Sequence, residues 1–325
     1  MPACNETTMD NGANEGVPVI ECGGVTKIYP GTGKGRRTPV CALRDVSLRV
    51  DGGTIIGLIG PNGAGKTTFL SLVAGLIFPT RGSIRVCGHP PRSLEARRSL
   101  GYIPESPVFL SRYTARGVLK HHAALHGLSR RAIADEADRR LAQLRMEEYA
   151  DRAVGGFSLG MRQRLALAVA LIDNPRLLLL DEPSNGLDPI GVIELRRILT
   201  EVRQAGATII ISSHRLGELE RLTSDYVFLH QGRIVRFGGE TPAGQVERLQ
   251  IEFLPGGPPV EEQTLAPYRS LEKSETTLTV AVGGIQDVPN VVGSLVKAGV
   301  RITAVALERP DVERTFVRLY QARSS

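Results

Sequence analysis

The segment GPNGAGKTT combines residue types that can hold a phosphate chain. Gly60, Gly65, Lys66 and Thr67 fit the pattern G-x-x-x-x-G-K-[ST], the P-loop or Walker A motif. In this pattern, backbone N–H groups surround a nucleotide β-phosphate, and a Cβ at these turns would block it or forbid the required dihedral angles. Lys66 would neutralise β- and γ-phosphate charge, and the Thr67 hydroxyl would ligate Mg²⁺. The predicted nucleotide-binding residues are Gly60, Pro61, Asn62, Gly63, Ala64, Gly65, Lys66, Thr67 and Thr68.

Two adjacent acids, Asp181 and Glu182, follow the apolar run Leu177 to Leu180. Acids that end a buried strand are costly unless a partner compensates their charge. Mg²⁺ would do so for Asp181. Glu182 would then face the water that attacks the γ-phosphate, as general base or as the group that orients the water. The alternative, a pair of acids on a solvated turn, stays open on this segment alone.

The segment FSLGMRQR lies directly before the apolar helical run LALAVALI. Ser158 is a good helix N-cap, and Gly160 permits the close approach of another group. The N-terminus of such a helix can bind an anion, although this segment carries no phosphate pattern of its own. A capped helix with no ligand is the alternative interpretation.

These segments need a framework of strands and helices. TIIGLIG, RLLLLDEP and ATIIISSH are short apolar runs, as in strands that are covered on both faces. A helical pattern follows the glycine-rich segment from Thr67 to about Leu76, and another runs from Ile190 to about Gln204, where Gly206 would end it. This alternation predicts an α/β fold with a mostly parallel sheet and helices on both faces.

Other segments differ from this core. Alternation around Val46, Leu48 and Val50 predicts a half-buried, antiparallel strand, and the charged stretch 113–150 predicts a helical insertion. After about Gly239 comes the turn-rich stretch LPGGPPVEEQ, and then TLTVAV, PNVVGSLVKAG, RITAVALE and DVERTFVRLYQ indicate strand, helix, strand and helix. The predicted organisation is a disordered tail (1–16), a nucleotide-binding domain (17–239) with a helical subdomain at about 105–160, and an α+β accessory domain (240–325).

Composition narrows the function only slightly. The chain has 325 residues and a net charge of +6, which favours anionic partners without choosing among nucleotides, nucleic acid and a membrane surface. No apolar run approaches the roughly 20 residues of a membrane helix. The N-terminal stretch lacks the pattern of a signal peptide. The four cysteines show no metal-binding spacing, so we expect reduced thiols.

GPNGAGKTT, FSLGMRQR, LLLLDEPSNGLDP and IIISSH occur in the order and spacing of the ATP-binding-cassette (ABC) ATPase family, which the chain resembles over roughly residues 19–239. The resemblance implies the P-loop ABC ATPase fold, with an antiparallel β subdomain and a helical subdomain. It also implies ATP and Mg²⁺ as cofactors and a sandwich dimer. Ser158 and Gly160 would cap the partner's ATP in trans, and Asp188 would lie in the loop between the two sites. His214 would contact the γ-phosphate and the attacking water, and Tyr29 would stack on adenine.

The chain departs from the family pattern in two segments. The usual signature is LSGGQ, whereas Leu159 replaces its first glycine and Met161 its glutamine; FSxGMxQR variants resemble those of exporter ATPases. Glu105, in GYIPES, stands where the family has a glutamine that reaches Mg²⁺ and senses the membrane partner. Glu105 could still contact the metal, and its added negative charge predicts a working but retuned coupling loop.

The resemblance implies an ATP-hydrolysing subunit of an ABC transporter, exporter-type, at the inner, cytoplasmic face of the membrane. Its partners would be a permease on a separate chain and a second ATPase, identical or paralogous. A soluble ABC ATPase acting on ribosomes or DNA is the alternative. Such relatives usually carry two cassettes or a long coiled-coil insertion, and no aromatic-basic surface for nucleic acid is evident. A P-loop kinase would leave the signature and His214 unexplained.

Overall fold

The computed structural model describes residues 17–31, 38–214, 219, 222–223, 225–238, 247–256, 258, 260 and 262–308. The chain divides into two compact units, Met1–Gly239 and Glu240–Ser325. Two sequence-based expectations lie outside the described residues: the disordered tail and the helix predicted for DVERTFVRLYQ.

A six-stranded sheet forms the centre of the first unit, in the order β5-β6-β7-β3-β8-β9. Neighbours from β5 to β8 pair in parallel, and β9 pairs antiparallel to β8. The strands span Leu100–Ile103 (β5), Leu177–Asp181 (β6), Thr208–Ser213 (β7), Ile55–Ile59 (β3), Asp225–His230 (β8) and Arg233–Gly238 (β9). The apolar runs therefore form buried parallel strands, as predicted, because both faces of such a sheet are covered.

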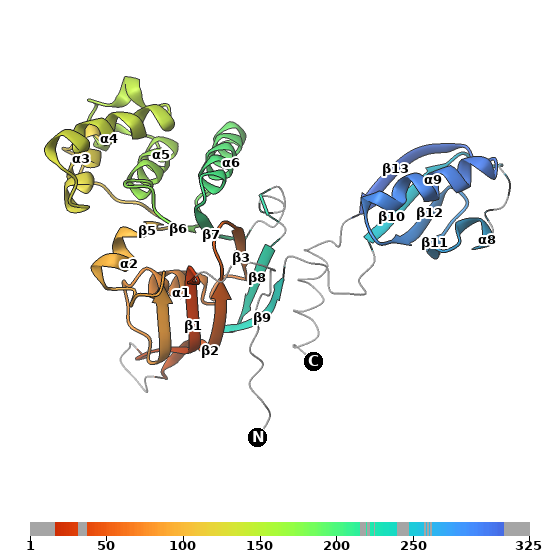
Figure 1. The fold of residues 1–325 in the computed structure, drawn as a ribbon, viewed down its shortest axis with the longest axis horizontal. Coiled ribbons are helices and arrows are strands. Elements are labelled where there is room, and N and C mark those ends of the chain that lie inside the picture. Colours follow the sequence, from red (N-terminus) through yellow and green to blue (C-terminus); the bar gives the residue numbers. More distant parts are fainter. Residues whose placement is uncertain are drawn as a thin grey trace. The chain divides into compact units, whose positions relative to one another are not determined.

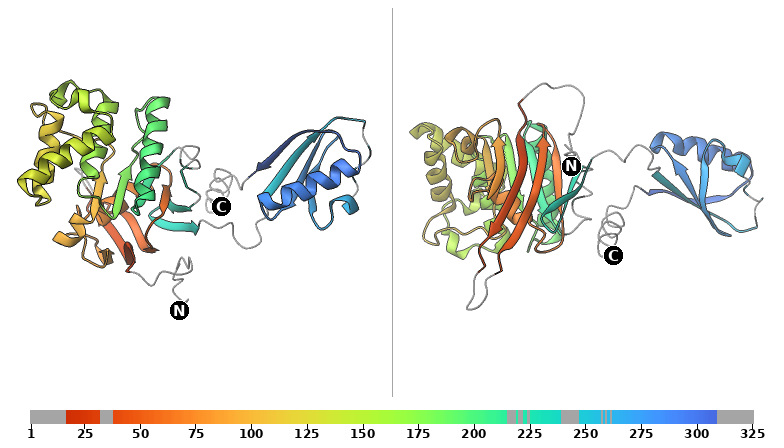
Figure 2. Two further views of the ribbon diagram at one scale, coloured as in Figure 1. Left: turned by 45° about the horizontal axis from the view of Figure 1, so that its top comes forward. Right: turned by 90° about the horizontal axis from the view of Figure 1, so that it is seen from below.

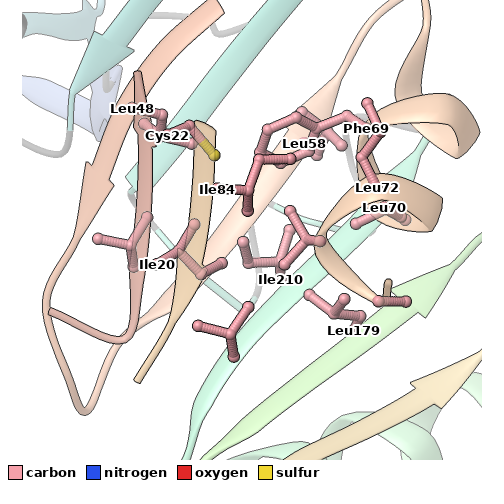
Figure 3. Close-up of a cluster of buried hydrophobic side chains, with 14 of the residues drawn as sticks. Ile20, Cys22, Leu48, Leu58, Phe69, Leu70, Leu72, Ile84, Leu179 and Ile210 are labelled. Carbon is pink, nitrogen blue, oxygen red and sulfur yellow. The ribbon is translucent and has the colours of Figure 1, made fainter. Parts of the chain in front are cut away.

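A second, antiparallel sheet has the order β2-β1-β4. Its strands span Ile20–Tyr29 (β1), Val40–Val50 (β2) and Arg81–Val86 (β4). One face of this sheet packs against the first helix of the unit and the parallel sheet (Figure 3). This core contains Cys22, Leu48 and Ile84 from the antiparallel sheet, Leu58, Leu179 and Ile210 from the parallel sheet, and Phe69, Leu70 and Leu72 from the helix.

Six α-helices are described in the first unit: Lys66–Val73 (α1), Leu94–Arg98 (α2), Ala115–Leu125 (α3), Arg130–Gln143 (α4), Leu159–Ala170 (α5) and Pro189–Gln204 (α6). Two short 3₁₀ turns, Glu147–Tyr149 and Val154–Gly156, complete the predicted helical region. Helices α3, α4 and α5 form a group on one side of the parallel sheet (Figure 1). Each of the helices α2 to α6 begins at a Ser, Thr or Asp whose side-chain oxygen accepts a backbone N–H bond.

A buried ion pair stabilises the helical group. Glu136 and Arg140 lie one turn apart on α4, and Arg140 Nε donates to Glu136 Oε1 at 2.8 Å. Glu136 also accepts from the backbone N–H of Asp173, and Arg140 donates to Asn174, so α4 is held to the turn that follows α5. No described helix combines the length and apolar character required to cross a membrane.

The second unit is an antiparallel sheet with the order β11-β12-β10-β13 and a helix packed on one face (Figure 2). Its elements span Glu247–Phe253 (β10), Glu262–Leu265 (α8), Arg269–Lys273 (β11), Thr277–Val282 (β12), Ile285–Asp287 (a 3₁₀ turn), Val288–Lys297 (α9) and Ile302–Glu308 (β13). Strands β12 and β13 and helix α9 occur where predicted. Strands β10 and β11 and helix α8 were not predicted from the sequence. The stretch LPGGPPVEEQ begins directly after β10 and extends into the first residues of α8, so it lies inside the unit.

Candidate functional site

Three parallel strands end at the same edge of the central sheet. The pairing register places Asp181 of β6 beside Ser212 of β7, and Ile59 of β3 beside Ser213. The glycine-rich segment follows β3, Glu182 follows β6 and His214 follows β7. The fold therefore brings together three segments that are far apart in the sequence, at the edge where parallel α/β sheets bind their ligands.

Two positions of the phosphate loop must be glycine. Neighbouring backbone leaves no room for a Cβ at either position, and the backbone conformation also favours glycine at one of them. A Cβ added to Gly60 would lie 2.3 Å from the carbonyl oxygen of Leu229, in β8. Gly65 has φ +109°, and a Cβ there would lie 2.6 Å from the carbonyl oxygen of Ala42. From the sequence alone, phosphate access and dihedral angles are the expected reasons for these glycines. The structure supports the dihedral reason at Gly65 and adds a steric reason at both positions.

Lys66 begins α1 and is only 7% exposed. Its Nζ donates to the carbonyl oxygen of Gly60 at 2.7 Å and lies 3.7 Å from Glu182 Oε1. No side chain caps α1, whose N-cap is Gly65. Since the first backbone N–H groups of a helix have no partner within it, this end of α1 offers donors and positive potential beside a cation.

A buried serine connects the two acids that follow β6. Asp181 is 1% exposed, and its Oδ1 accepts from Ser212 Oγ at 2.6 Å. The same Ser212 Oγ accepts the backbone N–H of Glu182 at 3.0 Å. Ser212 thus fixes the orientation of the Asp181 carboxylate and the backbone of the next residue with one hydroxyl group.

The second oxygen of Asp181 provides a test for Mg²⁺. Oδ2 is buried and has no hydrogen-bond partner among the described residues, an arrangement that is costly for a carboxylate unless a cation is bound. The described residues contain no group of three or more His, Cys, Asp or Glu side chains that could hold a metal alone. Mg²⁺ is often held by one or two carboxylates together with substrate phosphates, so these residues fit an Mg²⁺–nucleotide complex.

Glu182 links the lysine to the histidine. Its Oε2 accepts from the backbone N–H of His214 at 3.3 Å and lies 2.8 Å from His214 Nδ1. Glu182 is 6% exposed and has φ +50°, an unfavourable conformation for a residue with a Cβ. Backbone strain of this kind persists only where surrounding contacts impose it, and it concentrates at functional sites. The arrangement can hold a polyphosphate and remove a proton from a nearby water molecule.

Comparison with known proteins agrees with this geometry. The sequence profile of the family described as "ABC transporter" matches residues 43–185. The bacitracin transport ATP-binding protein of Bacillus licheniformis is 36% identical over 239 residues, which are 73% of this chain and 74% of the relative. An ABC transporter ATP-binding protein of Synechocystis, described as uncharacterized, is 32% identical over 94% of this chain and 85% of its own length. The chain belongs to the ABC transporter family.

A solved structure described as the ATP-binding subunit of an ABC transporter extends this result to the fold. Its TM-score is 0.59 at 33% identity, over 68% of this chain and 89% of that one. The predicted ABC ATPase fold is therefore confirmed. As a member of this family the chain is an ATP-binding component of a transporter.

Two other predicted residues, Tyr29 and Glu105, lie elsewhere in the cassette. The ring of Tyr29, at the end of β1, is partly exposed, and Lys27 Nζ lies 5.1 Å from its centroid. Glu105 is exposed and follows β5, whose Ile103 pairs with Leu180 of β6. Glu105 therefore follows the end of β5 at the same edge of the sheet where Asp181 ends β6. Roles for Tyr29 and Glu105 stay predictions.

The signature residues lie at the N-terminus of α5. Ser158 is exposed, and its Oγ accepts the backbone N–H of Met161 at 3.2 Å, so it caps the helix as predicted. Asp188 caps α6 by accepting the Gly191 N–H at 2.7 Å. Gly160 faces Leu187 of the segment before α6. Gly160 therefore lies beside the segment that contains Asp188.

Sequence reasoning missed Ser212. The available signal was a hydroxyl residue at the end of an apolar strand, two positions before His214. Its role depends on the register between β6 and β7, which the sequence pattern does not give.

Proposed function

We propose that this cassette hydrolyses ATP as part of a dimer and thereby drives a separate membrane permease in export. The main support for this proposal is that Lys66, Asp181, Glu182 and His214 lie together in one chain. The signature residues of the same chain are not part of this group. The pocket becomes complete when Ser158 and Gly160 of a second cassette, identical or paralogous, approach the bound nucleotide.

The residues would share the work of phosphoryl transfer to water. Lys66 would exchange its contact with the Gly60 carbonyl for the β- and γ-phosphate oxygens of ATP. Glu182 would accept the proton of the attacking water, and the neighbouring His214 would contact the γ-phosphate and keep that water in line. Burial of Glu182 supports this role, because a low local dielectric strengthens its interaction with a nearby water proton.

Thr67 and Asp181 would hold Mg²⁺, the former through its exposed hydroxyl group and the latter through the unpartnered Oδ2. The bound ion would neutralise charge on the phosphates. Ser212 would keep the Asp181 carboxylate oriented toward that position. Glu105, from the next strand, would stand close to the same ion or its water. Tyr29 would stack on the adenine ring.

The surface after Glu105 favours a partner protein. Val108 is 88% exposed, Leu110 63% and Tyr113 36%. Several exposed apolar side chains within one short segment are typical of an interaction site. We place the permease contact here, with the cassette peripheral at the cytoplasmic face of the membrane. The exporter-type signature FSLGMRQR supports the direction of transport.

The test is ATP turnover by the purified chain and by three variants. Lys66→Ala should abolish tight ATP binding in a direct binding assay. Glu182→Gln should retain binding, accumulate an ATP-bound dimer in size-exclusion chromatography, and lower turnover by about 10²–10⁴-fold, the usual contribution of a general base. Glu201→Gln, an exposed acid on α6, is the matched control and should behave as the unmodified chain. Full turnover in Glu182→Gln, or by a strict monomer, would overturn the proposal.

A further inference from the structure

Leu159, which replaces the first glycine of the usual signature, packs on the loop between β6 and α6. A Cβ added to Gly186 would lie 2.1 Å from Leu159 Cδ2, so this methyl group occupies the space above the Gly186 backbone. The adjacent Gly160 faces Leu187 Cδ2, and a Cβ there would lie 3.5 Å from it. Two consecutive residues of the signature therefore contact two consecutive residues of the loop within one chain.

A second contact joins α5 to the helix that follows this loop. Helices α5 and α6 stand side by side (Figure 1, Figure 2). Arg164 of α5 forms an ion pair with Glu194 of α6, and Arg145 Nη1 reaches the other oxygen of Glu194 at 3.2 Å. The signature helix thus contacts the loop before α6 through Leu159, and α6 itself through Arg164.

The loop itself carries hydrogen bonds back toward the catalytic acid. The backbone N–H of Asn185 donates to the carbonyl oxygen of Glu182 at 3.1 Å, and that of Leu187 donates to Ser184 at 3.1 Å. Asp188 then caps α6. Two overlapping turns therefore connect Glu182 to Leu187 through backbone hydrogen bonds.

We propose that Leu159 is a positioning residue that couples the signature to the catalytic glutamate of its own chain. In the dimer proposed above, on which this inference rests, Ser158 and Gly160 engage the nucleotide of the partner. When these two residues shift, Leu159 moves against Gly186. The 184–188 loop then moves with it and displaces the backbone of Glu182. Binding of ATP at one site would therefore adjust the hydrolytic group of the other site.

The side chain is the specific element of this coupling. A glycine at position 159 would leave the space above Gly186 empty, and the direct contact between α5 and this part of the loop would be lost. Leu159 is 42% exposed, so it contributes little to the hydrophobic core. Its removal is therefore expected to change the coupling more than the stability.

A double-mutant cycle on the full chain tests the contact. Leu159→Ala should lower kcat by roughly five- to tenfold, a coupling of the size found between contacting residues. Its apparent KM for ATP should stay within about twofold, because it removes an interaction that acts after nucleotide binding. Gly186→Ala should also lower kcat. The double variant should be no slower than Gly186→Ala alone, since the added Cβ no longer meets Leu159, whereas strain from φ +74° is present in both variants.

Controls separate coupling from general loss of an apolar group. Leu159→Met, which keeps the volume, should retain most of kcat. Leu125→Ala removes another exposed leucine, at the end of α3, and should leave kcat unchanged. If Gly186→Ala fails to fold, the comparison of Leu159→Ala with Leu159→Met decides. Unchanged kcat in Leu159→Ala, losses that multiply in the double variant, or an effect on KM alone would overturn the proposal.

Hydrogen exchange gives a readout that needs no turnover. Without nucleotide, Leu159→Ala should speed exchange of the backbone N–H groups of Asn185 and Leu187, which the loop turns protect. If Leu159→Ala speeds this exchange but the unmodified chain never hydrolyses ATP, the proposed function is rejected, whereas the contact between Leu159 and the loop is supported. Unchanged exchange together with unchanged kcat, in an active chain, would reject the coupling alone.

Discussion

Replacing Ser212 by alanine tests the arrangement of the two acids. The Ser212 hydroxyl group is the link between Asp181 Oδ1, at 2.6 Å, and the Glu182 N–H, at 3.0 Å. Ser212 has no exposed surface, so water cannot replace its hydroxyl group without a rearrangement. The variant would leave a buried carboxylate oxygen without its donor and a buried N–H without its acceptor.

The magnitude follows from these two losses. A buried group left without its partner costs about 1–3 kcal/mol, and more where it is charged, so we expect Ser212→Ala to lower the free energy of unfolding by about 3 kcal/mol. For a domain of this size, such a loss lowers Tm by roughly 6–12 °C. The freed carboxylate should also weaken Mg²⁺ binding by about 10–100-fold, as is typical when a residue that orients a metal ligand is removed.

The assay combines thermal unfolding with ATP turnover measured across a series of Mg²⁺ concentrations. Thr208→Val is the matched control, because Thr208 lies at the other end of β7, is equally buried and accepts the Gly53 N–H at 2.9 Å. It should lower Tm modestly without moving the Mg²⁺ concentration that gives half-maximal turnover. If Ser212→Ala lowers Tm but requires no additional Mg²⁺, Ser212 stabilises the fold and does not orient Asp181.

Three further predictions concern other parts of the chain. Burial raises the pKa of the Cys22 thiol to about 12, so a thiolate-selective reagent at pH 8 should leave Cys22 unlabelled in the native protein and label it in denaturant, as read by mass spectrometry. Phe69→Ala should lower the free energy of unfolding by about 3–5 kcal/mol in chemical denaturation, because it removes a ring from the core between the two sheets. Glu105→Gln should change stimulation of ATP turnover by the permease more than basal turnover; if both stay unchanged, the acid is incidental.

Several features of the site were predictable because they depend on short segments. The glycine spacing of GPNGAGKTT, the acids after an apolar run, and Ser158 before an apolar helix each carry their physical reason within a few residues. Hydrophobic periodicity located β3, β6, β7 and α6 for the same reason. In the second unit, β10 and β11 were missed because their polar residues obscure the alternation on which strand prediction depends.

The sequence by itself determined the type of chemistry, since a phosphate loop, a pair of acids and a histidine are local patterns whose residue types limit what they can bind. Only the tertiary structure decided how these groups meet: that Gly60 must be glycine beneath Leu229, that Ser212 connects Asp181 to Glu182, and that Leu159 covers Gly186. These contacts join segments far apart in the chain. Their geometry is set by strand register and helix packing, which no single segment encodes.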